Sequence, residues 1–423
     1  MTSHHDEAPE VLDLVVIGAG LSGLSLAFRA ATLGQRVVVL ESTPRVGGCI
    51  RSHQDHGLWF ELGAHTAYNS YGGMIALIEA TNLKDKLVQR AEPRKVFGLL
   101  KNGETTWLTP PKVLKKLSWW PMLWRVPVFH FGRKRGLTMK QRFSRLLGKK
   151  NFETILSPFL AAVPSQSADE FPAAGPGSLF KKRPRRKDIV RSFGLVGGLG
   201  TLTDALAAHP ALTVHTGCAA TRLVRLPDDT VRVSTADGSV FDARHVALAL
   251  PPDVGARLTA TAFPALSEAL GQIATTTVES LGVTLPIEAT WMPPCAFVVP
   301  VDDVFFSMVT RDPFPDPTRR AFTFHFRPNT SLETKLQRMA DVLKIERSDL
   351  GTRYPLTEQR VTLPSPRVGH DQIVAAIDKA LVGSPLAVTG NFFEGLAIED
   401  CIQRSFAECD RLFGPRLEHR ATS

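Results

Sequence analysis

Apolar runs and a helical period near the start of the chain predict a strand, a helix and a second strand. Residues 15–17 and 37–40 are continuous apolar runs of the kind found in buried parallel strands. Between them, apolar residues recur on one face of a helix that Gly34 ends: Leu21, Leu24, Phe28 and Ala31. The chain therefore begins with a predicted βαβ unit.

Three glycines occupy the turn of this unit at the spacing of a dinucleotide-binding site. Gly18 permits a tight turn after the strand, Gly20 lets a pyrophosphate approach the backbone, and Gly23 lets the helix pack close to the sheet. The N–H groups and the positive dipole end of the helix suit the phosphates. Glu41 ends the second strand, where its carboxylate can accept hydrogen bonds from ribose hydroxyls and disfavours the 2′-phosphate of NADP.

A second glycine pair and two arginines follow Glu41, at Arg45, Gly47, Gly48 and Arg51. An NAD enzyme does not need this extension, whereas the long diphosphate and ribityl chain of FAD needs further N–H groups and positive charge. The segment resembles the extended FAD motif of the flavin amine oxidase and protoporphyrinogen oxidase superfamily.

Residues 60–66 resemble the next segment of that superfamily, which runs beside the isoalloxazine ring. The superfamily usually has Pro and Arg at the positions of Ala64 and His65. This departure leaves two interpretations of His65 open, a neighbour of the flavin and a loop histidine that faces solvent.

The C-terminal part of the chain carries a matching half-site. Residues 386–390 predict a short buried strand, and residues 391–402 then enter a helix. A helix N-terminus aimed at the flavin would stabilise negative charge on the reduced ring, although a plain strand–loop–helix connection gives the same pattern. In the superfamily, the position that matches Ala220 contacts the adenine.

The resemblance implies FAD as cofactor. The residues expected to hold it are Gly18, Gly20, Leu21, Ser22, Gly23, Glu41, Arg45, Gly47, Gly48, Arg51, Gly63, Ala64, Ala220, Gly390, Asn391, Leu396, Ala397 and Ile398.

Three further stretches resemble the protoporphyrinogen oxidase branch, residues 138–172, 192–202 and 366–370. This branch implies an oxidase that converts protoporphyrinogen IX or coproporphyrinogen III to the porphyrin in haem biosynthesis. In it, hydride leaves a bridging carbon for flavin N5, and oxygen reoxidises the flavin. The tyrosine that the branch has after its proline is replaced by Arg367.

Other functions on the same scaffold therefore stay open. They are a flavin amine oxidase, a lipid desaturase-like oxidoreductase, and a non-catalytic protein that binds flavin or tetrapyrrole. Asn391 stands where amine-oxidising members have an acid, which disfavours the first of these. No catalytic residue is evident, and the candidate partners for substrate carboxylates are Arg94, Arg311, Arg327 and Arg367.

The elements together predict an α/β fold, with a discontinuous Rossmann-like FAD-binding domain, a mixed-sheet substrate domain and a helical insertion. The FAD-binding domain is expected at residues 10–90, 195–260 and 365–420, the substrate domain at 91–110 and 261–364, and the insertion at 111–190. Within the substrate domain we expect strands at 278–285, 297–300, 305–310 and 321–327. A helix over 329–347 is expected to bury one face: Leu332, Leu336, Met339 and Leu343.

Composition changes this picture little, because 43% hydrophobic and 22% charged residues are typical of a globular protein of two or three domains. No apolar run of 18 residues predicts a membrane span, and the first ten residues lack the apolar core of a signal peptide. Five widely spaced cysteines favour the reducing cytoplasm over disulfides or zinc, and twelve histidines show no metal-ligand spacing. We therefore expect a cytoplasmic enzyme without a metal.

The net charge of +9 is concentrated between Lys112 and Arg191, and the run 181–187 is the most basic. The same stretch contains several aromatic residues: Trp119, Trp120, Trp124, Phe129 and Phe131. This combination suits the anionic cytoplasmic face of a membrane, although the aromatic residues could equally form the core of a helical subdomain. The cations could also attract a polycarboxylate tetrapyrrole. Nucleic acid is disfavoured as a partner, and a homodimer stays open.

Overall fold

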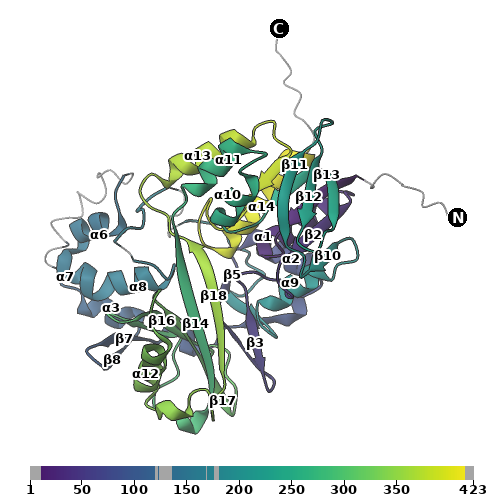
Figure 1. Cartoon of the computed structure of the whole chain (residues 1–423). Helices are drawn as coiled ribbons and strands as arrows, with labels where there is room; N and C mark the ends of the chain where they lie inside the picture. The colour runs from purple at the N-terminus through teal and green to yellow at the C-terminus, as the bar shows by residue number, and fades with distance from the viewer. Residues whose placement is uncertain (1–10, 120–121, 123–135, 168, 176–180, 415–423) are drawn as a thin grey trace.

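The computed structural model describes residues 11–119, 122, 136–167, 169–175 and 181–414 (Figure 1). Two seven-stranded sheets organise this part of the chain. We call them the first sheet, which contains the N-terminal strand, and the second sheet, which lies below it in Figure 1. The described fold is α/β, as the sequence predicts.

The first sheet has the order β10-β2-β1-β13-β12-β11, and β19 also pairs with β13. Its members are β1 (Leu12–Ile17), β2 (Val37–Glu41), β10 (Thr213–Thr216), β11 (Ala220–Arg225), β12 (Val231–Thr235), β13 (Val240–Leu248) and β19 (Leu386–Val388). Strands β10, β2, β1, β13 and β19 are parallel, while β11, β12 and β13 form an antiparallel meander. Three distant stretches of the chain thus meet in one sheet.

Helices cover both faces of the first sheet, which explains why its central strands are apolar throughout. Leu14 and Val16 of β1 belong to the core under one set of helices: α1 (Leu21–Thr32), α2 (Gly72–Ala80), α9 (Gly200–Ala207) and α14 (Ile398–Phe413). Val15 and Ile17 belong to the core on the other face, under α10 (Pro252–Thr259), α11 (Pro264–Gly271) and α13 (His370–Leu381).

The second sheet has the order β18-β14-β17-β16-β15-β7-β8 and is antiparallel except between β15 and β7. Its strands are β7 (Phe97–Lys101), β8 (Glu104–Leu108), β14 (Thr275–Pro286), β15 (Phe297–Pro300), β16 (Phe305–Thr310), β17 (Arg319–Phe326) and β18 (Leu356–Pro364). The strands expected at 297–300 and 305–310 are confirmed with the same bounds.

Helix α12 (Leu332–Leu343) covers one face of the second sheet, against the phenylalanines of β17. It is shorter than the predicted helix over 329–347. The prediction of its buried face was wrong for Leu332, which is 59% exposed because it occupies the first turn. Lys335 is buried instead, and its ammonium group pairs with the carboxylate of Glu279 on β14.

Smaller elements connect the two sheets. A ribbon of β3 (Ser52–Asp55) and β4 (Leu58–Glu61) and a small sheet of β5 (Ala67–Tyr68), β9 (Ser192–Leu195) and β6 (Leu87–Gln89) lie between them. The short turns are η1 (Lys84–Lys86), η2 (Glu92–Lys95), η4 (Ile287–Ala289) and η5 (Arg347–Asp349). Thr323 of β17 donates a 2.8 Å hydrogen bond to the carbonyl of Glu61, so β4 lies on the face opposite α12.

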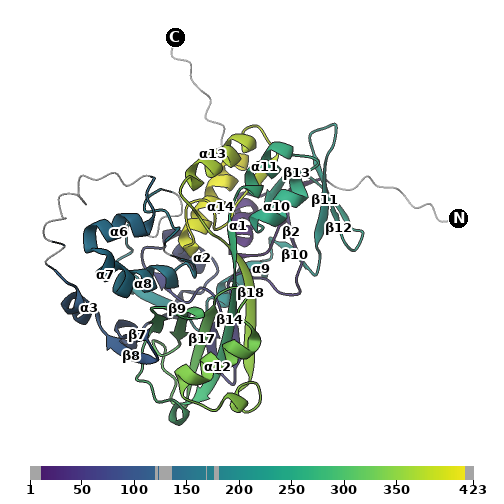
Figure 2. The same cartoon turned by 60° about the vertical axis from the view of Figure 1, so that its left-hand side comes forward.

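A group of helices projects from the side of the second sheet (Figure 2). They are α3 (Pro110–Lys116), α6 (Met139–Leu147), α7 (Lys149–Asn151), the π-helical turn η3 (Phe152–Leu156) and α8 (Ser157–Ala162). Phe159 of α8 anchors the group by packing on Phe97 of β7, with ring centroids 4.9 Å apart. Within the described residues, no helix is both long and apolar enough to cross a membrane.

Candidate active site

The turn after β1 requires glycine at two positions for steric reasons. Gly18 has φ +106°, and a Cβ there would lie 2.4 Å from the carbonyl oxygen of Ala249. A Cβ on Gly23 would lie 2.0 Å from the carbonyl oxygen of Gly18. Both distances are far below any van der Waals contact, so these residues allow α1 to start directly against the sheet.

Two glycine loops contact each other at the N-terminus of α1, and we call the backbone surface that they form the slot. Gly20 is the N-cap of α1, and a Cβ built on Gly48 would lie 3.0 Å from the Cα of Gly20. Gly47 donates a 2.8 Å hydrogen bond to the carbonyl of Ala19, which holds the loops together. Leu21 and Ser22 follow as the first residues of α1, and Gly47 and Gly48 both have positive φ. A backbone surface without side chains at a helix N-terminus suits a diphosphate, and side chains at Gly20 or Gly48 would block the approach of the phosphates.

Glu41 is held firmly at the end of β2. Its carboxylate accepts 2.9 Å hydrogen bonds from the backbone N–H groups of Ala19 and Thr43, and a third from the Thr43 hydroxyl. A longer bond of 3.4 Å comes from the Ser42 hydroxyl, so Oε1 accepts three hydrogen bonds and Oε2 accepts one. A carboxylate oxygen can accept about two, so Oε2 can still accept one from the ribose hydroxyl that the sequence predicts as its partner.

The two arginines of the extended motif brace loops. The Arg45 guanidinium donates to the carbonyls of Gly48 at 2.9 Å and Val46 at 3.0 Å, and burial lowers its pKa. Arg51 donates a 2.8 Å hydrogen bond to the carbonyl of Glu358 and so ties the motif to β18. In this structure both side chains act on protein carbonyls, and any contact with FAD stays a prediction.

Gln359, the next residue of β18, was not identified from the sequence. Its side-chain amide N–H lies 3.4 Å from the carbonyls of Gly48 and Cys49, above the glycine slot. Its side-chain oxygen is buried and has no hydrogen-bond partner among the described residues. A buried acceptor without a partner is costly, so this atom is suited to a donor on a molecule bound in the slot.

The C-terminal half-site lies beside the N-terminal one, because α14 packs along α1 (Figure 1). Gly390 and Asn391 follow β19 and are half-buried, and Ala220 is half-buried at the start of β11. Residues 396–398 lead into α14, where Ala397 is the N-cap.

Two acids in the first turn of α14 were missed by the sequence analysis, although acidic residues are a known signal of a helix start. The Glu399 carboxylate accepts hydrogen bonds from the N–H groups of Gly73 at 2.8 Å and Met74 at 3.1 Å, and so caps α2. Asp400 pairs with Arg183 at 2.5 Å and with Lys181 at 3.2 Å. We call these last three residues the clasp.

The clasp changes the interpretation of the basic run 181–187. Besides Lys181 and Arg183, Arg186 is also paired, with Glu79 at 2.8 Å and with Asp188 at 2.6 Å. Three cations of this run are thus neutralised within the molecule. Of the predicted aromatic patch, Trp119 is 48% exposed. The other members, Trp120, Trp124, Phe129 and Phe131, lie outside the described residues.

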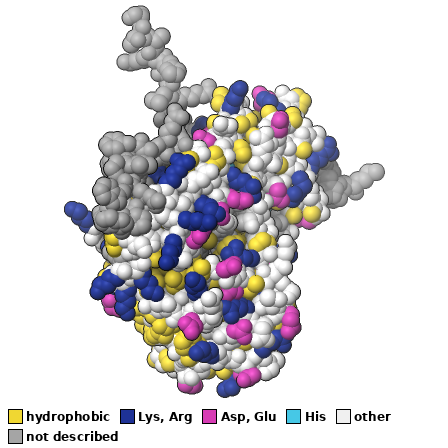
Figure 3. All heavy atoms as spheres, turned by 90° about the vertical axis from the view of Figure 1, so that its left-hand side faces the viewer, with side chains coloured by type: hydrophobic (Ala, Val, Ile, Leu, Met, Phe, Trp, Pro, Cys, Tyr) yellow, Lys and Arg dark blue, Asp and Glu magenta, His cyan; other side chains and the backbone are white. Residues whose placement is uncertain are grey.

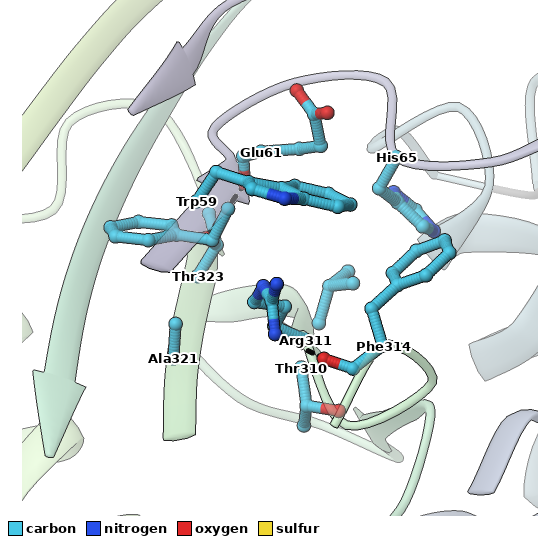
Figure 4. Close-up of a pocket in the computed structure, with 10 residues that line it drawn as sticks. Trp59, Glu61, His65, Thr310, Arg311, Phe314, Ala321 and Thr323 are labelled. Atoms are coloured by element: carbon cyan, nitrogen blue, oxygen red, sulfur yellow. Dashed lines mark hydrogen bonds between the residues drawn. The ribbon is translucent and has the colours of Figure 1, made fainter. Parts of the chain in front are cut away.

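A pocket opens between β4 and the second sheet, beside the segment expected to run along the flavin ring (Figure 4). The space inside it, together with open solvent at its mouth, is about 300 Å³. Its walls are Trp59, Phe60, Glu61, His65, Val309, Thr310, Arg311, Phe314, Ala321 and Thr323. The loop that carries His65 is pressed against the extended motif, because a Cβ on Gly63 would lie 2.3 Å from the carbonyl oxygen of Cys49. The next residue, Ala64, is exposed.

Burial shifts two titratable groups of this pocket strongly. The pKa of His65 falls to about 3, first because of burial and then because of the charges of Arg90 and His325, so its imidazole is neutral. The pKa of Glu61 rises to about 7 because of burial. Hydrogen bonds of 2.7 Å from the Leu199 N–H and the Ser52 hydroxyl oppose that rise. His65 lines the pocket and is half-buried.

Of the four arginines proposed as carboxylate partners, the structure places Arg311 in the pocket. Arg367 is mostly exposed and pairs with Glu170 at 3.0 Å. Arg327 stacks on the ring of Phe306, and the guanidinium of Arg94 donates to the carbonyl of Arg90. Among the described residues, no group of three or more acids, cysteines and histidines could hold a metal ion.

Comparisons with known proteins agree with this geometry. A protoporphyrinogen oxidase of Nicotiana tabacum is 25% identical over an alignment of 247 residues, which covers 48% of this chain and 48% of that protein. An all-trans-retinol 13,14-reductase of Danio rerio is 44% identical over 57 residues, 14% of this chain and 9% of that protein. The chain thus matches about half, or much less, of the length of these curated relatives.

A solved structure has the same fold along nearly the whole chain. It is that of a protein of Exiguobacterium sp. 255-15 assigned as a protoporphyrinogen oxidase, with a TM-score of 0.75, 18% identity, and coverage of 96% of this chain and 99% of that one. The sequence pattern of the family described as flavin containing amine oxidoreductase matches residues 21–293. The chain therefore belongs to the flavin containing amine oxidoreductase family and is an FAD-dependent oxidoreductase.

Proposed function

We propose that the chain is an FAD-dependent oxidase that converts a porphyrinogen, protoporphyrinogen IX or coproporphyrinogen III, to the porphyrin. The observation that carries the proposal is the pocket beside the flavin segment, where the aromatic rings of Trp59 and Phe314 and the guanidinium of Arg311 meet. Flat rings with acidic substituents are the substrate chemistry that such walls suit. The similarity to the tobacco enzyme and Asn391 in place of an acid support the same assignment.

The chemistry places few demands on protein acids and bases. Bound FAD supplies a hydride acceptor at its N5 position. The bridging carbon of a porphyrinogen is flanked by pyrroles, which stabilise the cation left when hydride departs. The protein has to orient that carbon and exclude water, and the rings of Trp59 and Phe314, with centroids 5.0 Å apart, can contribute by holding a substituent of the substrate.

The two titratable walls of the pocket fit this modest role. His65 stays neutral at physiological pH, so it adds no charge near the developing cation. Glu61 is held by Leu199 and Ser52 and exchanges its proton near neutral pH. We assign Glu61 a positioning role for the loop that carries His65.

Oxygen as electron acceptor and a peripheral position on the cytoplasmic face of a membrane are parts of the same proposal. Figure 3 shows Lys and Arg side chains next to hydrophobic ones on the side of the molecule that carries the projecting helices. The exposed residues there include Lys115, Lys116 and Trp119. Charged lysines beside an exposed indole suit an anionic lipid surface. A homodimer has no specific support.

The test is oxygen uptake by the FAD-loaded protein with four substrates: protoporphyrinogen IX, coproporphyrinogen III, benzylamine and phytoene. We expect uptake with a porphyrinogen together with the appearance of porphyrin fluorescence, and none with the amine or the polyprenoid. Uptake with benzylamine or phytoene alone would replace the proposal by an amine oxidase or a desaturase. A yellow protein that binds porphyrin without turnover would be a carrier.

A further inference from the structure

We propose that the pocket is a binding site for one carboxylate group of the substrate, with Arg311 in its wall and Arg90 as a second cation behind His65. The inference rests on the proposed function for the identity of the whole substrate, and on the pocket alone for the charge of the group. It assigns an anionic substituent to this pocket and excludes a substrate ammonium group from it.

Arg311 has donors that the described protein leaves unused. Its guanidinium lies 4.6 Å from the centroid of the Trp59 ring, and one terminal nitrogen donates to the carbonyl of Phe314. Its Nε is buried and has no hydrogen-bond partner among the described residues. Figure 4 shows the guanidinium facing the ring of Trp59. A guanidinium stacked in this way keeps an edge for a planar carboxylate.

The acids nearest to Arg311 are already engaged. Asp312 pairs with Arg320 at 2.5 Å and accepts a 2.9 Å hydrogen bond from the backbone N–H of Cys295. Asp316 accepts hydrogen bonds from the backbone N–H groups of Thr318 at 2.9 Å and Arg319 at 3.0 Å. Neither carboxylate forms an ion pair with Arg311 among the contacts of the described residues.

Arg90 provides the second cation and is the more deeply buried one. It is 9% exposed, and its Nε has no hydrogen-bond partner among the described residues. Besides burial, the groups that shift its pKa are Tyr68 and Arg94, so no aspartate or glutamate of the described residues compensates its charge. The N–H of Ala91 donates a 2.7 Å hydrogen bond to the carbonyl of Pro313, which fixes this segment against the loop that carries Phe314.

Arg90 also acts on the wall of the pocket itself. Its charge is, after burial, the next cause of the low pKa of His65. The imidazole is therefore neutral and adds no repulsion toward an anion. Figure 4 shows the Glu61 carboxylate directed away from Arg311, where Leu199 and Ser52 hold it.

The balance of charge then determines which ligand the pocket takes. Burial lowers the pKa of Arg311 and the charges of Asp316 and Asp312 oppose that shift, but neither Arg311 nor Arg90 has an ion pair among the contacts of the described residues. Burying such cations is unfavourable, and an anion from outside reduces that cost, whereas an ammonium group would increase it. The pocket is too small for a tetrapyrrole, so only a substituent would enter it and the remainder of the substrate would lie at its mouth. The carbon chain that carries the carboxylate would pack against the rings of Trp59 and Phe314.

The test compares three small ligands of the same size on the FAD-loaded protein: benzoate, benzylamine and benzyl alcohol. Calorimetric titration gives each Kd, and the flavin absorbance spectrum reports whether the ligand lies next to the cofactor. We expect benzoate to bind at least about tenfold more tightly than benzyl alcohol and to perturb the spectrum, and benzylamine to bind most weakly.

Variants locate the effect. Arg311→Met and Arg90→Met should each weaken benzoate binding about tenfold or more without changing the Kd of benzyl alcohol. Arg327→Met is the matched control, since Arg327 also stacks on an aromatic ring, 4.4 Å from the centroid of Phe306, and is not part of the pocket wall. It should change the benzoate Kd by less than about twofold. Bound FAD and the melting temperature report whether each variant folds. If Arg90→Met loses FAD, the benzoate Kd of Arg311→Met alone tests the carboxylate site.

Equal affinity for benzoate and benzyl alcohol, tighter binding of benzylamine, or an unchanged benzoate Kd in Arg311→Met would each overturn the inference. None of these results depends on turnover. Benzoate binding that needs Arg311 in a protein that does not oxidise porphyrinogens would retain the carboxylate site and reject the proposed function. Porphyrinogen oxidation that is unchanged in Arg311→Met and Arg90→Met would retain the proposed function and reject the carboxylate site.

Discussion

The cofactor slot and the substrate pocket adjoin each other but are built in opposite ways. The slot is made of backbone from residues that are close in sequence, chiefly Gly18, Gly20 and Gly48. The pocket is made of side chains from β4, the following loop and the second sheet, with Arg90 behind it. The slot depends on the absence of Cβ atoms, and the pocket depends on the charge and shape of particular side chains.

This difference indicates which changes each site tolerates. A backbone slot accepts almost any sequence around its glycines, so cofactor binding persists while the substrate changes. The pocket can be altered by a single substitution, because each of its walls is one side chain. The predictions below test this contrast in order of decreasing effect.

Gly20→Val should have the largest effect, because the branched side chain would block the slot opposite Gly48. We expect bound FAD to fall below about a tenth of the wild-type stoichiometry, measured by absorbance after gel filtration. The control is Gly271→Ala, where a Cβ would meet only the Cβ of Ala256 at 4.0 Å. A Gly20→Val protein with full FAD content would refute the assignment of the slot.

Asp400→Asn tests whether side chains, as well as backbone, stabilise the part of the protein that is expected to hold FAD. The substitution leaves Lys181 and Arg183 without their shared carboxylate, at the start of α14. We expect a loss of about 1–3 kcal/mol in the free energy of unfolding, a lower melting temperature and faster release of FAD. Arg186→Ala removes the more exposed ion pairs of the same run and should leave the melting temperature nearer to wild type. Equal losses in both variants would contradict a special role of the clasp.

Glu61 lies between the slot and the pocket, and Glu61→Gln tests whether its buried carboxyl group makes the free energy of unfolding depend on pH. Since the pKa of Glu61 is about 7 in the folded protein and 4.5 in the unfolded chain, the folded protein binds one more proton than the unfolded chain between these pH values. Its contribution to stability is complete below about pH 4.5 and is lost as the pH rises to about 7, by an amount on the order of 3 kcal/mol.

The Gln variant lacks this titration, so its stability relative to wild type should rise from pH 4.5 to pH 7. Urea unfolding at several pH values with excess FAD measures this difference. Glu268→Gln, on the exposed side of α11, serves as the control and should follow the wild type at every pH. Parallel curves for Glu61→Gln and wild type would show that the carboxyl titrates normally.

The same contrast explains what could be predicted from the sequence. The βαβ turn and the strands at 297–300 and 305–310 follow from local periodicity, and glycine spacing reports backbone geometry directly. The pocket could not be predicted, because its walls are far apart in sequence and burial decides their roles. Arg311 was one of four equivalent candidates, and Arg90 carried no signal that distinguishes a buried guanidinium from a surface one.

The clasp shows that the pairing of charged residues could not be predicted from the sequence either. A run of seven residues with six cations predicts a surface for a membrane or an anionic ligand. Its partners Glu79 and Asp400 lie more than a hundred residues away in one direction and more than two hundred in the other. Neutralisation by such distant acids depends on tertiary structure, which local charge patterning does not report.

Leu332→Ser should have the smallest effect. It tests a position of α12 where the helical period alone predicts burial wrongly. The helical period assigns Leu332 to the buried face of α12, yet it is 59% exposed, whereas Met339 on the same predicted face is fully buried. We expect Leu332→Ser to change the free energy of unfolding by less than about 0.5 kcal/mol, and Met339→Ala to lower it by about 2–5 kcal/mol. Urea unfolding of both variants measures the difference. Because the first turn of α12 projects beyond the core, a comparable loss in both would mean that its N-terminus packs more closely than the structure shows.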